Sequence, residues 1–79
     1  MIHLETMAAI EKEAEKSIAD HKPFNSVHEG YAVLFEEVDE LWEEVRKKSK
    51  NRSKKRMREE AIQIAATAIR FIEDLCLED

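Results

Sequence analysis

The fold is decided by residues 26–45, which read SVHEGYAVLFEEVDELWEEV. Ser26, followed three residues later by Glu29, has the form of a capping box, which marks the start of a helix. The apolar residues that follow alternate spacings of four and three, as in the seam of a coiled coil: Val27, Tyr31, Leu34, Val38, Leu41 and Val45. We therefore predict a helix over about residues 27–48. Gly30 weakens a helix relative to alanine, so we expect another helix to approach it closely.

Two further helices are predicted on either side of this stretch. Upstream, Met7, Ile10, Ala14 and Ile18 recur at helical spacing and predict a helix over about residues 2–20, which ends before Pro23. Downstream, Asn51 and Ser53 suit a turn and an N-cap, and a third helix is expected over about residues 54–77. Its apolar stripe covers nearly half of the circumference, which favours burial against more than one neighbour. Phe35 and Trp42 flank the seam, and together with Tyr31 they are expected in the core or at a subunit interface.

Length and composition limit the alternatives. The 79 residues allow one domain, and the single Gly and single Pro exclude a turn-rich β-sandwich or barrel. The net charge of −5 argues against nucleic acid as a partner. Because no apolar run approaches the length of a membrane span and no secretory segment is visible, we expect a soluble, cytoplasmic protein with no membrane partner. The lone Cys76 cannot form a disulfide within the chain.

These observations predict an all-α fold. A chain this short buries only about 60–65% of the surface that its unfolded form exposes, so a second subunit is the expected way to complete the core. We predict a three-helix subunit in which the second and third helices form an antiparallel hairpin. Such subunits would assemble into a helical bundle as a dimer or tetramer.

Acidic residues crowd the predicted second helix. Six lie between Glu36 and Glu44 with no basic residue among them. Glu37, Glu40 and Glu44 fall within an arc of about 60°, where like charges repel. In an antiparallel hairpin Glu60 comes level with them, so that carboxylates from two helices would face each other across a groove. Clustered carboxylates of this kind suit Mg²⁺; a solvated acidic face is the alternative.

The spacing of these acids resembles that of a known family. Glu36-Glu37-x-x-Glu40, nineteen intervening residues and then Glu60-x-x-Gln63 is similar to the motif of the MazG-like, all-α nucleoside triphosphate pyrophosphohydrolases, which ends in Glu-x-x-Asp. The sequences of residues 28–41 and 66–75 also resemble short phage and prokaryotic members. The resemblance spans about residues 24–75 and implies that residues 1–79 form a single MazG-like helical domain.

The resemblance implies a reaction and a metal. Family members hydrolyse a nucleoside or deoxynucleoside triphosphate to the monophosphate and pyrophosphate, use Mg²⁺ (with Mn²⁺ as the alternative) and work as dimers or tetramers. Glu37, Glu40 and Glu60 match metal ligands, and Glu36 matches a catalytic glutamate that binds a metal or orients the attacking water. Gln63 stands where the family has aspartate, and its neutral amide should hold Mg²⁺ more weakly. The alternative is a non-catalytic MazG-like module for nucleotide sensing or protein interaction.

Basic residues gather between the second and third helices. Nine of the thirteen residues from Arg46 to Arg58 are Lys or Arg. Candidates for holding the outer phosphates of a substrate are Lys47, Lys48, Lys54, Lys55 and Arg58, with Lys54 and Arg58 foremost. Arg70, on the edge of the polar strip of the third helix, is a further candidate. The alternatives are a solvated loop and, for Arg70, a plain ion pair.

Overall fold

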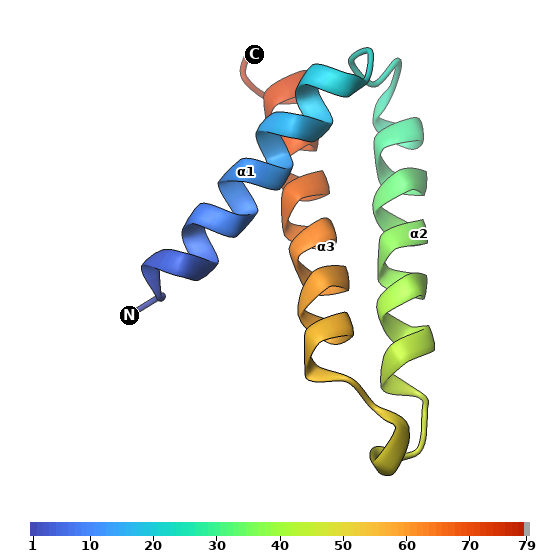
Figure 1. Ribbon diagram of the computed structural model, residues 1–79. Coiled ribbons are helices and arrows are strands. Elements are labelled where there is room, and N and C mark those ends of the chain that lie inside the picture. Colours follow the sequence, from blue (N-terminus) through green and yellow to red (C-terminus); the bar gives the residue numbers. More distant parts are fainter. Residues whose placement is uncertain (79) are drawn as a thin grey trace.

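Three α-helices make up the computed structural model, which describes residues 1–78 (Figure 1). They are α1 (Leu4–Asp20), α2 (Val27–Val45) and α3 (Lys54–Leu75), and a short 3₁₀ turn, η1 (Ser49–Asn51), lies between α2 and α3. None of the described residues is in a β-strand. The all-α prediction with three helices is therefore confirmed. Among residues 1–78, no helix has both the length and the apolar character needed to cross a membrane.

Side chains at the predicted caps set the helix ends. The Ser26 hydroxyl accepts a hydrogen bond from the backbone N–H of Glu29 at 3.1 Å, as in a capping box. The Glu29 carboxylate instead accepts the backbone N–H of Asn25 at 2.9 Å, one residue further out than the usual pattern. Ser53 caps α3 in the same way by accepting the N–H of Arg56.

Two helices end earlier than predicted. The second helix ends at Val45 rather than near residue 48, and the third at Leu75 rather than near residue 77. At the end of α2, Nε of Arg52 reaches back from the loop and donates to the Val45 carbonyl at 2.8 Å. A carbonyl in the last turn of a helix lacks an intrahelical partner, and the loop supplies one here.

α3 lies between the other two helices and packs on both. α1 crosses α3 at an angle and, within residues 1–78, makes no packing contact with α2 (Figure 1). Gly30, near the start of α2, lies against Phe71 and Leu75, near the end of α3: a Cβ at Gly30 would sit 2.6 Å from a ring carbon of Phe71. The close helix approach expected at Gly30 is therefore present, and an alanine there would force Phe71 to move.

The linker between α1 and α2 is held on α3 by a group of four residues, which we call the linker cluster: Lys22, Phe24, Arg70 and Asp74. The guanidinium of Arg70 lies 3.8 Å from the centroid of the Phe24 ring and donates to the Lys22 carbonyl at 3.0 Å. Asp74 accepts the backbone N–H of Phe24 at 3.1 Å and lies 3.4 Å from Nε of Arg70. Charge, stacking and a backbone hydrogen bond thus pin the linker to the last turns of α3.

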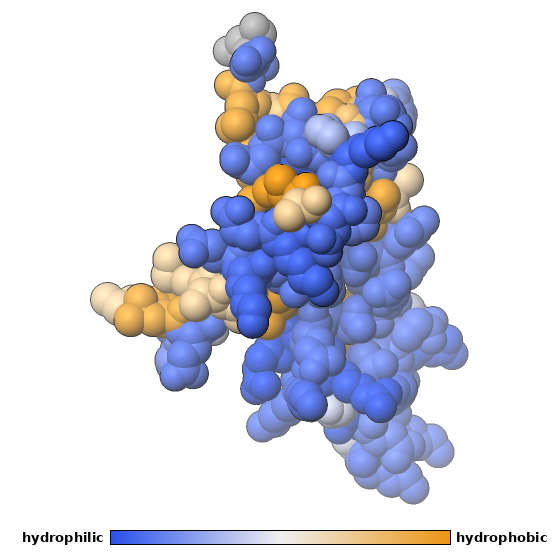
Figure 2. Space-filling view, turned by 45° about the horizontal axis from the view of Figure 1, so that its top comes forward, coloured by the Kyte–Doolittle hydropathy of each residue, from blue (hydrophilic) through white to orange (hydrophobic). Residues whose placement is uncertain are grey.

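The core of a single chain is small. The buried apolar residues among those described are Ala14, Phe24 and Ala66. Figure 2 shows apolar side chains lying among hydrophilic ones on the face in view, including the start of α1 at the left, where Ile2 and Leu4 are exposed. The predicted seam of α2 divides: Leu34, Leu41 and Val45 are half-buried, whereas the other members, Val27, Tyr31 and Val38, are exposed. One chain therefore leaves much of its apolar surface without a partner.

Candidate metal centre

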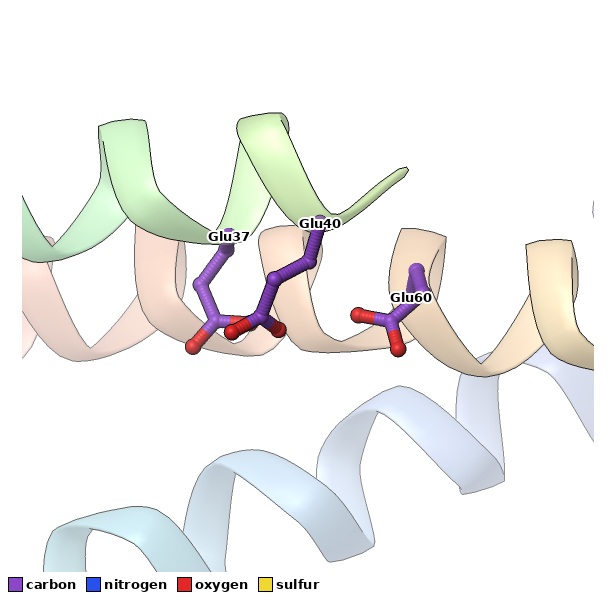
Figure 3. A group of neighbouring side chains, drawn as sticks. All are labelled: Glu37, Glu40 and Glu60. Carbon is purple, nitrogen blue, oxygen red and sulfur yellow. The ribbon is translucent and has the colours of Figure 1, made fainter. Parts of the chain in front are cut away.

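Three carboxylates from two helices converge beside the α2–α3 contact. Glu37 and Glu40 lie one turn apart on α2, and Glu60 reaches toward them from the second turn of α3 (Figure 3). Each offers an oxygen, and these three oxygens lie within 4.8 Å of one another. We call these residues the carboxylate trio. The structure thus brings together the three acids that the sequence analysis expected to face one another.

The trio is electrostatically unfavourable as it stands. Burial raises the pKa of Glu37 above its ordinary value, and the neighbouring Glu40 raises it further by its charge and by a hydrogen bond to the protonated form. The pKa of Glu60 is raised by burial first, then by a hydrogen bond shared with Glu40 and by the charges of Glu40 and Glu44. Each group therefore holds a proton more tightly than an isolated glutamate does.

One oxygen of the trio also lacks any partner. Oε2 of Glu60 is buried and makes no hydrogen bond. A buried acceptor without a partner costs free energy, and an ionised one costs more. A bound cation would satisfy this oxygen and cancel the repulsion at once.

The donor set fits a hard divalent cation. Mg²⁺ takes oxygen ligands at 2.0–2.1 Å, keeps several waters and is usually held by one or two carboxylates together with substrate phosphates. Oxygens on opposite sides of one Mg²⁺ are about 4.2 Å apart. The three carboxylate oxygens lie within 4.8 Å of one another, and small rotations of the exposed Glu40 and half-buried Glu37 side chains would bring them to this distance. Glu37, Glu40 and Glu60 are thus the residues that would hold the ion.

The remaining motif residues lie at the edge of the trio. Glu36 is exposed and about 100° around α2 from Glu37, and its charge contributes to raising the pKa of Glu37. Gln63, one turn after Glu60, lines a hollow of about 170 Å³ together with Glu37 and Thr67. The end of α1 closes this hollow on the other side with Lys16 and Ser17, among others. Residues of all three helices therefore line this hollow.

The basic residues are arranged differently from the prediction. Lys54 and Arg58 project from α3 about 120° and 160° away from Glu60, and Arg58 lines a hollow beside the start of α1. The structure therefore does not bring these two to the trio within one chain. Instead, Lys55 and Arg56 line an open hollow of about 400 Å³ that also contains Glu60. Arg56 and Glu60 are one helical turn apart, and this spacing in the sequence could have identified Arg56 as a neighbour of Glu60.

Arg70 belongs both to the linker cluster and to the lining of the hollow near Gln63. It lines the hollow next to Gln63, but its guanidinium is already engaged with Lys22, Phe24 and Asp74. Its contacts are those of the ion pair that the sequence analysis gave as the alternative, and contact with a substrate stays a prediction. Lys47 is likewise paired, through a 2.9 Å contact with Glu44.

No protein-family model, curated protein or solved structure matched this chain when it was compared with known proteins.

Proposed function

We propose that this chain is a Mg²⁺-dependent nucleotide pyrophosphohydrolase of the MazG-like class. It would convert a nucleoside or deoxynucleoside triphosphate to the monophosphate and pyrophosphate. The observation that carries the proposal is the convergence of Glu37, Glu40 and Glu60 within 4.8 Å, at positions that match metal ligands in the family motif. In this proposal α2 and α3 form the antiparallel hairpin of a subunit that assembles as a dimer or tetramer.

The residues around the trio suit a triphosphate. Bound Mg²⁺, or Mn²⁺ in its place, would offset the charge of the phosphates and lower the pKa of a coordinated water. Lys55 and Arg56 line the hollow that Glu60 also lines. They would hold the outer phosphates and so fix the orientation of the triphosphate. Glu36, next to Glu37 but outside the trio, would orient the attacking water and accept its proton.

Pyrophosphate release tests the activity. The protein is incubated with each NTP and dNTP in the presence of Mg²⁺, and pyrophosphate and monophosphate are measured. Glu40→Gln removes one charge from the trio, and the matched control Glu43→Gln makes the same chemical change at an exposed position outside it. We expect turnover by the wild type and by Glu43→Gln only. Turnover of every nucleotide no faster than that of Glu40→Gln would remove the enzyme proposal.

Gln63 favours one alternative function. Gln63 brings no charge where the family has aspartate. With one negative charge fewer around the metal, the site would bind a metal–nucleotide complex but would not hydrolyse the nucleotide. The chain would then be a non-catalytic module for nucleotide sensing or protein interaction. Calorimetry with nucleotide and Mg²⁺ separates these functions: binding without pyrophosphate release indicates sensing, and no binding indicates an interaction module.

A further inference from the structure

A groove lies between α1 and α3, and we call it the α1–α3 groove. It has a volume of about 360 Å³, within the range of ligand pockets. Most of its lining is apolar, and three exposed glutamates border it. The apolar residues are Met7, Ile10, Ala14, Ile18 and Ile69, and the glutamates are Glu11, Glu15 and Glu73.

The groove and the carboxylate trio use different sides of α3. Ile69 and Glu73 lie about 180° and 140° around the axis of α3 from Glu60. α1 crosses α3 at an angle, and the two helices diverge toward the start of α1 (Figure 1). Met7 is 52% exposed, so no part of the chain within residues 1–78 fills the groove at this end.

The length of the groove suits a helix. Its α1 lining runs from Met7 to Ile18, which is about 16 Å along the helix axis, or three turns. A helix that docks in a groove presents apolar anchors at positions i, i+3, i+4 and i+7, over a similar length. Such a row of anchors would extend along the apolar lining, whereas a compact ligand would cover only part of it.

The charges at the edge of the groove favour a basic occupant. Within residues 1–78, none of the three glutamates forms an ion pair. Lys or Arg residues on either side of the anchors of a docked helix would lie opposite Glu11 and Glu15 on α1 and Glu73 on α3. Charge complementarity of this kind speeds association and excludes acidic partners.

A second copy of this chain fits the groove less well. Across a two-fold axis the same surface meets itself, so Glu11 and Glu15 would lie near the same acidic surface of the other copy and repel it. The basic run of the chain, residues 46–58, cannot provide the row of anchors, because its one apolar residue is Met57.

We propose that the α1–α3 groove is a docking site for a basic amphipathic helix of a partner protein. Its apolar anchors would pack on Met7, Ile10 and Ile69, and its Lys and Arg residues would pair with the three glutamates. Because the groove and the trio lie on different sides of α3, docking does not rest on the proposed function and requires neither metal nor nucleotide.

A model peptide tests the proposal. The probe is a helical peptide of about 18 residues (five turns), with leucines along one face and lysines at the other positions. Its binding to the full chain is measured by fluorescence anisotropy in EDTA, so that no metal occupies the trio. We expect saturable one-to-one binding that weakens as the salt concentration rises from about 0.1 M to 1 M. Two control peptides should not bind: one with glutamate in place of every lysine, and one of unchanged composition whose leucines do not share a face.

A charge placed in the groove should block docking. Met7→Lys puts an ammonium group where the anchors would pack, and we expect it to weaken binding of the lysine peptide by about tenfold or more. Ala32→Lys is the matched control, because it adds the same charge at an exposed position on α2, outside the groove. It should bind nearly as the wild type does.

Removal of the bordering charges gives a second test on exposed positions. Glu11→Gln combined with Glu15→Gln should weaken binding roughly fivefold, through loss of two surface ion pairs. Asp39→Asn combined with Glu43→Gln removes two charges at the same spacing on α2 and should have little effect. This pair of variants tests the proposal even if Met7→Lys fails to fold.

Three results would overturn the proposal. They are no binding of the lysine peptide, equal binding of the glutamate peptide, or equal weakening by the Glu11/Glu15 and Asp39/Glu43 double substitutions. If Met7→Lys instead converts a wild-type oligomer to monomers in sedimentation velocity, a second copy occupies the groove and the proposal is wrong. Glu40→Gln should bind the peptide as the wild type does, so failure of docking and failure of the metal centre are separately visible.

Discussion

The linker cluster and the carboxylate trio are two charged groups on the same helix, α3, and they are built in opposite ways. In the linker cluster, the side chains of Arg70 and Asp74 are 10% and 9% exposed, have opposite charges and share partners in the linker. The buried Nε of Arg70 makes no hydrogen bond, but it lies 3.4 Å from the opposite charge of Asp74. In the trio, Glu37, Glu40 and Glu60 have the same charge, and one buried oxygen of Glu60 lacks a partner. Burial with a partner holds the fold together, whereas crowding without a partner leaves a site that a cation would complete.

The largest effect should come from breaking the linker cluster. Arg70→Ala leaves Asp74 buried without its partner and removes the stacking on Phe24, which should cost about 3–5 kcal/mol of unfolding free energy. Urea denaturation followed by circular dichroism measures it. Arg46→Ala is the matched control, because its pair with Glu43 is largely exposed and should be worth less than about 1 kcal/mol. Equal losses for the two variants would show that Arg70 does not hold the linker.

A smaller effect should follow from adding a charge next to the trio. Gln63→Asp places a fourth carboxylate one turn from Glu60, and attraction across a partly solvated site is worth on the order of 1 kcal/mol. We expect Mg²⁺ affinity measured by calorimetry to rise several-fold, and any pyrophosphohydrolase activity to rise with it. Gln63→Asn shortens the side chain equally without a charge and should not tighten binding. An unchanged affinity in Gln63→Asp would place Gln63 outside the metal site.

The smallest effect should come from relieving the repulsion in the trio. Because the pKa values of Glu37 and Glu60 are raised in the folded protein, the folded state binds more protons than the unfolded state while the pH lies between their ordinary value of about 4.5 and the raised values. Their contribution to stability is therefore favourable at low pH and is lost as pH rises through the raised pKa values. Without metal, Glu60→Gln should be more stable than wild type at neutral pH, by at most about 1 kcal/mol.

Thermal unfolding at several pH values checks this contrast. The advantage of Glu60→Gln over wild type should shrink as the pH falls toward 5, and Glu43→Gln should show no such trend. A Glu60→Gln variant that is less stable than wild type at neutral pH without metal would mean that Glu60 has a stabilising partner and that the trio is not a repulsive cluster.

The sequence predicted the features that depend on local periodicity. It did not predict the features that depend on contacts between residues far apart in the sequence. Helix number, the Ser26 and Ser53 caps and the meeting of Glu37, Glu40 and Glu60 follow from spacing along the chain and from the pairing of neighbouring helices. Two helix ends were wrong by two or three residues, and at the end of α2 a distant residue, Arg52, donates to the Val45 carbonyl from the loop.

The rotation of each helix about its axis was harder to predict. Lys54 and Arg58 were the foremost candidates for the site, but the residues beside Glu60 are Lys55, a lesser candidate, and Arg56, which was not named. One residue along a helix changes the direction of the side chain by about 100°. The contacts of Arg70 depend on a linker almost fifty residues earlier, which no local pattern reveals. Likewise, spacing alone could not tell which half of the α2 seam is half-buried and which half is exposed.

Titration with Mn²⁺, followed by electron paramagnetic resonance, tests the central claim most directly, because it detects the ion at the carboxylates without requiring turnover. We predict one bound ion per chain in the wild type and in Glu43→Gln, displaced by excess Mg²⁺ and lost in Glu40→Gln. No binding in the wild type, or the same binding in Glu40→Gln, would contradict the claim that Glu37, Glu40 and Glu60 form a metal centre.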